Sequence, residues 1–479
     1  MVSAEETLNE AIDHTWPWMR FNAHAELKDD RFSTNGRIEF KIEQWNEKKE
    51  TQQIHDGIFN ANEWVQVKSF LEQKFKGNRK DGIKCISEHL MVRPNRGWDQ
   101  FSEITAVFKI LITRHVFEWK FREVIRQCQR QLFSGIETRM MVFQKVGNDD
   151  GVGTIDIFEQ LGILRAILKE QDDKEKEQTR EDANHSHGEK HQKTDSRRVR
   201  ISVVLATSRQ FQLERMEEDF QKALECIEKY PDLITGFDVV GPESTQSCSS
   251  EQMYSFLKKA QHELRMLVDV EEYQSSHDVG LRLHAGESTV SYWSNFGLRL
   301  IHRPNSNVQM ALDLGCKRIS HFLAANDFQI LQAKRQGVII EACLITAQKL
   351  QAIDRIQDHP IHRWIDMGLK VAISPDNPST YGCDFIDEFL YILWLGGPCC
   401  LWLLHNVIVN SIQGYLMGEE EEKRELAKFE ADWTDWVKDS LKPNKYFVTA
   451  QNLQGQEYND GDDSVGTFAY LRFSSVAWP

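Results

Sequence analysis

Histidine, aspartate and glutamate side chains follow several short apolar runs of this 479-residue chain. Imidazoles and carboxylates bind divalent metals such as zinc, and they also donate or accept protons during catalysis. Imidazoles with one carboxylate leave an open position on a zinc ion, where a water can be activated. These residue types therefore predict a metal or proton-transfer site. The candidates are His24, Glu137, Arg139, Asp238, Glu243, His284, Glu287, His321, Asp376 and Asn377.

The candidate residues lie in or directly after eight β-branched runs that alternate with stretches of helical period. Strands that alternate with helices favour right-handed crossovers and a parallel sheet, and eight of them favour a closed (β/α)8 barrel. The C-terminal ends of the strands then form one rim, where the active sites of such barrels are built. No Gly-x-Gly-x-x-Gly turn follows the first run, which argues against a dinucleotide-binding fold. The predicted strands are 19–24, 135–143, 199–206, 234–241, 279–284, 317–321, 338–343 and 370–376.

Composition and charge argue against several classes of protein. Asp and Glu number 73 against 58 Lys and Arg, a net charge of −15, so no nucleic-acid partner is expected. The nine cysteines form no Cys-x-x-Cys pair, which favours reduced thiols and a cytoplasmic location. The first residues carry no apolar segment typical of a secretory signal. The longest apolar stretch, 389–409, is broken by Gly396, Gly397 and Pro398, so no membrane span is expected.

One segment, 169–198, contains a single alanine and no larger apolar residue. Such a segment cannot bury enough surface to offset the entropy of ordering it, so we predict a disordered insertion. Its histidines could form a metal cluster, but a flexible hydrophilic loop is the favoured interpretation. These histidines are His185, His187 and His191.

Five motifs occur in order, each at the end of a predicted strand. They are Gly236-Phe-Asp-Val-Val-Gly-Pro-Glu243, Leu283-His-Ala-Gly-Glu-Ser288, Lys317-Arg-Ile-Ser-His321, Ile340-Glu-Ala-Cys343 and Ile373-Ser-Pro-Asp-Asn-Pro378. With them the sequence resembles the adenosine deaminases of the metal-dependent amidohydrolase superfamily, from about Trp98 to about Trp436 and more weakly back to about residue 17. Its spacing is closest to the adenosine deaminase-related growth factor branch. The resemblance implies a (β/α)8 TIM barrel with an N-terminal helical extension. It also implies hydrolytic deamination of a small molecule, an aminopurine nucleoside or a related heterocycle.

The resemblance further implies roles for individual residues. His24, His284 and Asp376 correspond to metal ligands, so one zinc ion is the expected cofactor. Glu287 corresponds to the proton donor to the purine ring and His321 to the histidine that orients the attacking water, while Asp376 also contacts that water. Substrate contacts are predicted for Glu26, Glu137, Asp238, Gly241, Phe322 and Asn377.

For three residues a structural role is the alternative. Arg139 is interpreted as one side of a structural ion pair, with Glu137 as the nearest candidate partner on the same strand. Glu137 could instead reach the rim and touch a polar substrate group. Asp238 is interpreted first as a residue that binds loop backbone.

Four positions depart from the family pattern. Asn22 stands where the family has a metal-ligating histidine, and an amide oxygen is a far weaker zinc ligand than an imidazole. Asn377 replaces an aspartate of purine recognition, and Phe322 replaces a glycine. Residues 344–347 replace a polar Pro-x-Ser-Asn turn by Leu-Ile-Thr-Ala. We therefore expect a weakly bound metal, with Asn22 as a degraded ligand, and poor activity on adenosine.

Three functions remain open at this point: a metal-dependent deaminase, a repurposed member that works without a tightly held metal, and a binding protein without catalysis. The retention of Glu287, His321 and Asp376 together favours catalysis. The expected organisation is an N-terminal strand and helical extension (1–134), a barrel body (135–441) and a tail (442–479) whose stretch 467–473 could form an edge strand or cover a neighbouring subunit. A homodimer is left open.

Overall fold

The computed structural model describes most of the chain, with gaps concentrated in the first 75 residues and at the C-terminus. It divides into two compact units, residues 1–425 and 426–479; of the second unit, the described part is the end of the helix α16 (Glu419–Ser440). The predicted tail lies outside the described residues. The described ranges are 2–14, 19–25, 38–45, 51–53, 65–66, 75–92, 97–149, 153–184, 198–268, 279–287, 305–396, 400–415 and 418–440.

The first unit is built around a sheet of seven parallel strands, in the order β13-β12-β11-β10-β9-β8-β5. Most residues of these strands are buried, polar ones included, as expected for a sheet covered on both faces; β8, for example, is buried from its second residue to its last. The strands are β5 (Gly135–Met141), β8 (Arg200–Ser208), β9 (Ile234–Val240), β10 (Gly280–Ala285), β11 (Arg318–His321), β12 (Ile339–Ala342) and β13 (Lys370–Ile373).

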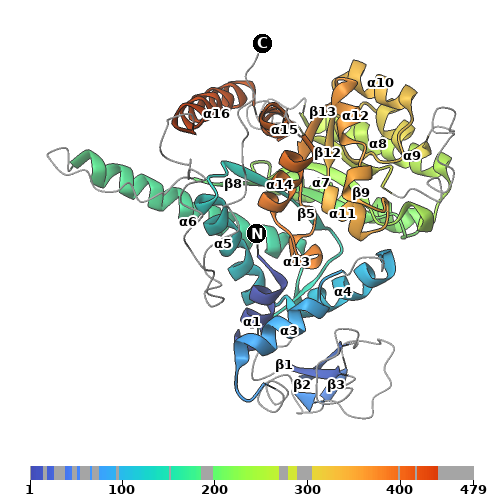
Figure 1. Ribbon diagram of the computed structural model, residues 1–479. Helices are drawn as coiled ribbons and strands as arrows, with labels where there is room; N and C mark the ends of the chain where they lie inside the picture. Colours follow the sequence, from blue (N-terminus) through green and yellow to red (C-terminus); the bar gives the residue numbers. More distant parts are fainter. Residues whose placement is uncertain are drawn as a thin grey trace, which may run out of the picture. The chain divides into compact units, whose positions relative to one another are not determined.

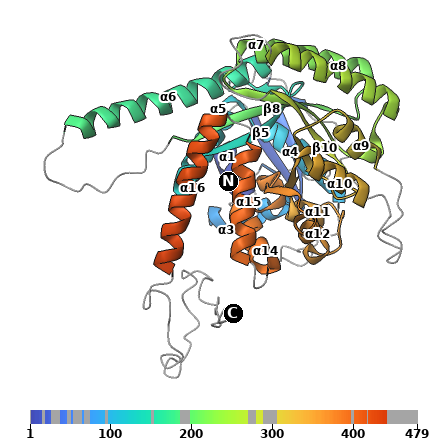
Figure 2. The same cartoon turned by 90° about the horizontal axis from the view of Figure 1, so that it is seen from above.

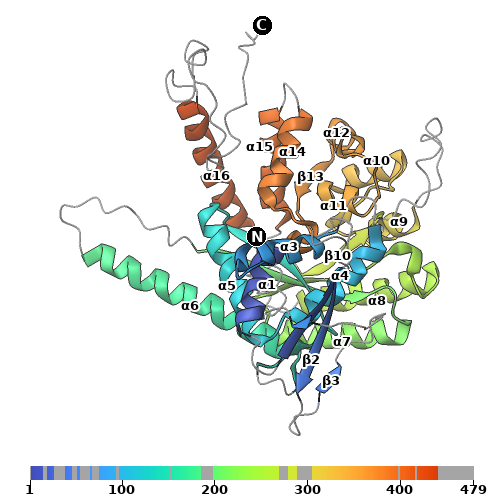
Figure 3. The same cartoon turned by 60° about the horizontal axis from the view of Figure 1, so that its bottom comes forward.

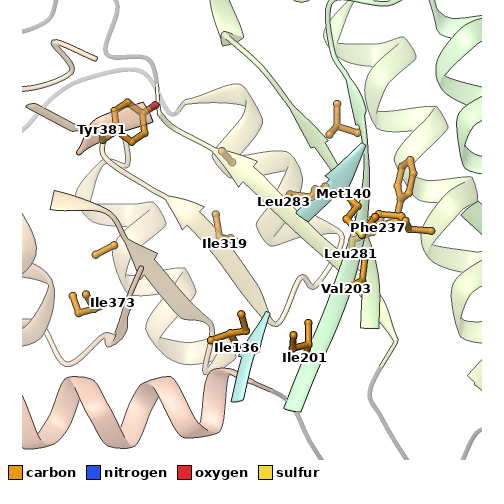
Figure 4. Close-up of a cluster of buried hydrophobic side chains, with 14 of the residues drawn as sticks. Ile136, Met140, Ile201, Val203, Phe237, Leu281, Leu283, Ile319, Ile373 and Tyr381 are labelled. Atoms are coloured by element: carbon orange, nitrogen blue, oxygen red, sulfur yellow. The ribbon is translucent and has the colours of Figure 1, made fainter. Parts of the chain in front are cut away.

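Helices connect successive strands and cover the outer face of the sheet (Figure 1). The helices α7 (Leu213–Lys229) and α8 (Ser250–Val268) lie side by side over strands β8 to β10 (Figures 2 and 3). Side chains inside the sheet, such as Ile201, Leu283 and Ile319, form the core (Figure 4). The other connecting elements are η1 (Glu243–Thr245), α9 (Ser306–Asp313), α10 (Asp327–Gln336), α11 (Leu344–Lys349), η5 (Ile356–Asp358), α12 (Ile361–Asp366), α13 (Pro378–Tyr381), α14 (Phe385–Gly396) and α15 (Cys400–Gly414).

The prediction of a (β/α)8 barrel of the metal-dependent hydrolase type is confirmed, and seven predicted strands occur within a few residues of their expected bounds. The first predicted strand differs. It forms β1 (Met19–Ala25), which pairs antiparallel with β2 (Ile38–Trp45) and β4 (Val65–Gln66) in a separate sheet that also contains β3 (Thr51–Gln53) (Figure 1). The sequence of β2 alternates apolar and polar residues, which is typical of an antiparallel strand with one covered face.

The N-terminal extension is therefore partly β-sheet. Its helical part comprises α1 (Ala4–His14), α3 (Arg79–His89), α4 (Gly97–Leu111) and α5 (Arg114–Arg130). A short hairpin of β6 (Val146–Gly147) and β7 (Thr154–Ile155) follows β5.

The polar insertion differs from its prediction in its first half. The helix α6 (Ile157–Asn184) continues through residues 169–184, and it extends well away from the sheet (Figures 1 and 2). Lys, Glu, Gln and Arg are good helix formers, and i, i+3 pairs such as Asp173 with Lys176 (3.9 Å) add to helix stability without any core. The predicted disorder, and the three histidines, fall in the remainder, 185–197, outside the described residues.

Removing residues 174–196 and joining the ends by a short Gly-Ser linker should leave the free energy of unfolding within about 1 kcal/mol of wild type, because surface segments contribute little beyond loop closure. The contacts that anchor the segment would remain: Gln171 exchanges two hydrogen bonds with the backbone of Val199, and Asp172 pairs with Arg198 at 2.8 Å. Urea denaturation checks this. A loss of several kcal/mol would show that the removed part packs against the barrel.

Within the described part of the chain, each helix is too short or too polar to cross a lipid bilayer.

Candidate active site

The C-terminal ends of neighbouring strands bring the predicted catalytic residues to one rim. Parallel pairing of β10 with β11 sets Ala285 opposite His321, so that His284 and His321 lie on adjacent strands with their ring centroids 5.0 Å apart. Asp376 follows β13, and β12 lies between β11 and β13. The rim therefore assembles imidazoles and a carboxylate that are distant in sequence.

Asp238, at the end of β9, fixes the orientation of His284. Its Oδ2 lies 2.6 Å from His284 Nδ1, and its Oδ1 accepts a hydrogen bond of 3.0 Å from the His284 backbone N–H. Burial disfavours the charge on Asp238, but the His284 imidazole and the Arg139 guanidinium outweigh it and lower the pKa to about 2. The Nδ1 atom is thus engaged, and Nε2 is the nitrogen left to bind a metal or substrate.

Arg139 forms a network of hydrogen bonds and ion pairs inside the barrel. Its Nε lies 2.9 Å from Asp238 Oδ2, and its two terminal nitrogens bind the carboxylate of Glu341 at 3.0 and 2.9 Å. Ser320 Oγ accepts a further hydrogen bond of 2.8 Å. The structural role predicted for Arg139 agrees with this network, although its partners are Asp238 and Glu341 rather than Glu137.

Glu137 does not reach the rim. It lies near the start of β5, where it forms a buried ion pair with Arg318 and accepts a hydrogen bond of 3.1 Å from Thr235 Oγ1. Both of its oxygens are engaged inside the barrel, so the substrate contact predicted for Glu137 is corrected to a structural ion pair. Asp238 is fully buried behind His284, which likewise gives it a positioning role.

Glu287 and His321 form a buried pair at the centre of the site. Glu287 Oε1 lies 3.3 Å from His321 Nε2, and both residues are at most 4% exposed. Burial, reinforced by the nearby carboxylate of Asp376, raises the pKa of Glu287 well above its usual value. Burial together with the His284 imidazole lowers the pKa of His321 well below its usual value. Both shifts favour the uncharged forms, a protonated carboxylic acid beside a neutral imidazole.

The backbone at the rim is strained at the same residues. His321 and Asp376 adopt positive φ angles of 68° and 55°, and Phe322 one of 60°. Residues other than glycine rarely adopt this left-handed conformation, and such strain concentrates at functional sites where packing enforces it.

Metal-binding atoms converge beside this pair. One nitrogen of His321, the sulfur of Cys343 and one carboxylate oxygen of Asp376 all lie within 4.8 Å of one another. His321 Nε2 is buried and makes no hydrogen bond among the described residues. Nitrogen, oxygen and sulfur donors of this kind fit a borderline ion such as zinc, so the rim is suited to a divalent metal.

The other residues predicted for the site lie in different environments. Gly241 adopts a φ of 103°, which a side chain would disfavour. Phe322 is fully buried, with its ring 6.0 Å from that of Trp364, so its ring belongs to the core. Asn377 is exposed and precedes α13. The backbone of Asn22 and His24 lies on β1, but their side chains, and Glu26 entirely, are outside the described residues; their roles stay predictions.

Comparison with known proteins identifies the family. The family model described as adenosine deaminase matches residues 186–426, half of the chain. The chain belongs to the adenosine deaminase family. Among curated relatives, adenosine deaminase 2 of Sus scrofa is 26% identical over 249 residues, which cover 50% of this chain and 44% of that protein. Adenine deaminase of Aspergillus oryzae is 28% identical over 170 residues, covering 33% of this chain and 42% of that protein. The chain thus spans less than half the length of these relatives.

Solved structures show the fold of the adenosine deaminase family over most of the chain. Arabidopsis ADAL complexed with IMP has a TM-score of 0.53 at 16% identity and covers 77% of this chain and 92% of its own. Adenine deaminase from Arthrobacter aurescens has a TM-score of 0.51 at 14% identity and covers 78% and 94%, respectively. At sequence identities this low, the similarity shows the barrel fold alone.

Two residues of this adenosine deaminase family member were missed as site residues from the sequence. Glu388, on α14, is fully buried and accepts hydrogen bonds of 3.1 Å from the backbone N–H groups of Leu344 and Ile345, which fixes the turn after β12. Burial raises its pKa to about 8. The feature of the sequence that could have indicated Glu388 is a charged residue within an otherwise apolar helix. The second residue is Cys343, whose sulfur lies beside His321 and Asp376. Its position at the end of a predicted strand could have indicated it.

Proposed function

We propose that this protein is a metal-dependent hydrolase that removes the amino group of an aminopurine nucleoside, nucleotide or related heterocycle. The observation that carries the proposal is the buried pair of Glu287 and His321 beside His284 and Asp376. A neutral carboxylic acid next to a neutral imidazole provides a proton donor and a proton acceptor at one point, which hydrolytic deamination requires. Family membership supports the same reaction.

In this proposal each residue has a defined role. Glu287 gives its proton to a ring nitrogen of the substrate, which makes the neighbouring carbon electrophilic. Asp376 accepts a hydrogen bond from the attacking water, and His321 takes a proton from that water and passes it to the amino group. The carbon–nitrogen bond then breaks, ammonia leaves, and the remaining hydroxyl proton returns to Glu287 as the carbonyl forms. Asp238 keeps His284 in one tautomer, and Arg139 holds Asp238 in place.

A single divalent ion, zinc in the first instance, fits the donors at the rim. His284 and Asp376 would hold it, together with His24 and, weakly, Asn22 if β1 reaches the rim, while His321 and Cys343 lie close by. When bound, the ion lowers the pKa of a coordinated water and so supplies a nucleophile near neutral pH. A solved amidohydrolase of similar fold contains bound zinc.

Adenosine itself should be a poor substrate. Residues 344–347 are buried and mostly apolar, and Phe322 is packed into the core, so polar partners for a nucleoside are fewer than in the family pattern. Solved proteins of similar fold are complexed with the nucleotides IMP and GMP, and one is an N6-mAMP deaminase. These similarities support a screen that extends beyond nucleosides.

The test is a turnover assay of zinc-loaded protein with adenosine, adenine, AMP and N6-substituted AMP, followed by release of ammonia or the corresponding amine. Turnover of at least one compound, with adenosine slower than the best, is the expected result. Failure of a metal-loaded, folded protein on all of them would favour the alternative of a repurposed or catalytically impaired member.

Metal affinity provides a second prediction. Asn22→His should raise zinc affinity by roughly tenfold or more, because an imidazole replaces a weak amide ligand. Zinc content after dialysis against graded chelator measures this, with Gln336→His at the exposed end of α10 as a control for histidine introduced elsewhere. Equal retention in wild type and Asn22→His would place Asn22 outside the metal site.

We also propose a cytoplasmic location, supported by the eight described cysteines, which are free thiols. A homodimer stays a proposal to be tested by light scattering.

A further inference from the structure

A second group of metal-binding side chains lies far along the sequence from the catalytic residues, where α1 meets α5. Nε2 of His115 lies 2.9 Å, and Nε2 of His14 3.2 Å, from the same oxygen of Glu10. The two imidazole rings are 4.1 Å apart at their centroids and inclined by 31°. Three ligand atoms thus meet within 4.8 Å of one another.

The backbone preorganises this group. Glu10 and His14 are four residues apart on α1, so both side chains lie on one face of the helix. His115 lies in the first turn of α5, where its backbone N–H is held by Asp149 Oδ1 at 2.7 Å. Two helices separated by about a hundred residues of chain therefore present their donors to one point.

From this geometry we propose that Glu10, His14 and His115 bind a divalent transition-metal ion such as zinc. Two imidazole nitrogens and one carboxylate oxygen match zinc, cobalt or nickel rather than calcium or magnesium, which prefer oxygen ligands. The side chains of His14 and His115 are 47% and 41% exposed, so water can complete the coordination and the ion can enter from solvent. The proposal is independent of the proposed catalytic function.

Such an ion would fix α1 to α5 at one end of α1. At the other end, the Val2 carbonyl accepts a hydrogen bond of 2.7 Å from Ser379, three residues beyond Asp376. Leu8 and Ala11 are buried between these ends. The metal should therefore stabilise the docking of α1 beside α13.

The test compares the full chain with His115→Gln, stripped by chelator and then titrated with zinc chloride. Glutamine keeps a polar side chain but removes the imidazole. Wild type should bind one more equivalent of zinc than His115→Gln, and zinc should raise the thermal midpoint of wild type more than that of the variant. The catalytic rim is present in both proteins, so its own metal cancels in the comparison. Excess magnesium should not reduce the difference.

His262→Gln on α8, which removes another exposed histidine, is the matched control and should bind as wild type does. Circular dichroism without zinc shows whether each variant is folded. If His115→Gln fails to fold, His14→Gln takes its place with the same expected loss of one equivalent. Equal zinc stoichiometry in wild type and a folded variant would overturn the proposal.

Discussion

Replacing Glu287 by glutamine will lower the turnover number of the metal-loaded protein by ~10²–10⁴-fold while leaving substrate binding nearly unchanged. Glutamine has the size of the acid and can still donate a hydrogen bond, but it cannot transfer a proton. The carboxyl group lies 3.3 Å from His321 in a buried site, where burial raises its pKa and keeps the proton available. Steady-state rates and direct binding of the product separate the two effects.

Glu214→Gln, on the exposed face of α7, is the matched control, since it makes the same chemical change away from the rim. Its turnover should equal that of wild type. A Glu287→Gln protein that keeps more than about a tenth of wild-type turnover would remove Glu287 from the role of general acid and would direct attention to Asp376 as the remaining carboxyl group.

The main sheet was predictable because short runs that contain apolar residues alternate with helices along the chain. In β8, buried Val203, Val204 and Leu205 follow one another, as expected for a strand covered on both faces. The rim followed from the same reasoning, since parallel strands place their C-terminal residues together. The same reasoning predicts from the sequence that His284, His321 and Asp376 lie together at the rim, where the structure places them.

Contacts across the barrel could not be read from the sequence. Arg139 reaches Asp238, 99 residues away, and Glu341, 202 residues away, and no local pattern connects them. Glu137, two residues away, is the partner that the sequence suggests. Residues 137 and 139 of a strand do point to the same face, but they lie at different heights along the strand, so their side chains meet different partners. The sheet to which the first strand belongs was predicted wrongly because a nearby partner was overlooked. Ile38–Trp45 alternates apolar and polar residues, and Met19–Ala25 pairs with it rather than with the main sheet.

Arg139→Met should lower the free energy of unfolding at pH 7 by about 3–5 kcal/mol, because it leaves buried carboxylates without their main counter-charge. Asp238 is fully buried and Glu341 is 8% exposed, so water cannot replace the guanidinium. Arg318 Nε, 3.3 Å from Glu341, offers only partial compensation. Urea denaturation followed by circular dichroism measures the loss.

Arg122→Met is the matched control, since Arg122 also binds two carboxylates, those of Glu118 and Glu170, at 2.9 and 2.8 Å. These pairs are largely exposed, and exposed ion pairs contribute about 0–1 kcal/mol. Similar losses in the two variants would show that burial of the Arg139 network adds nothing. A small loss in both would mean that Asp238 and Glu341 find other partners.

The pH dependence of stability distinguishes the Arg139 network further. Burial disfavours the charge on Glu341, but Arg139 and then Arg318 outweigh it and lower its pKa below the usual value, and the pKa of Asp238 is about 2. Because both pKa values are lower in the folded state than in the unfolded state, their contribution is complete above about pH 5 and is lost as the pH falls through about 4 toward 2. Wild type should therefore lose stability steeply over this range. In Arg139→Met the two carboxyl groups take up protons at higher pH in the folded state, so its stability should change less there, and the difference between the two proteins should narrow in acid.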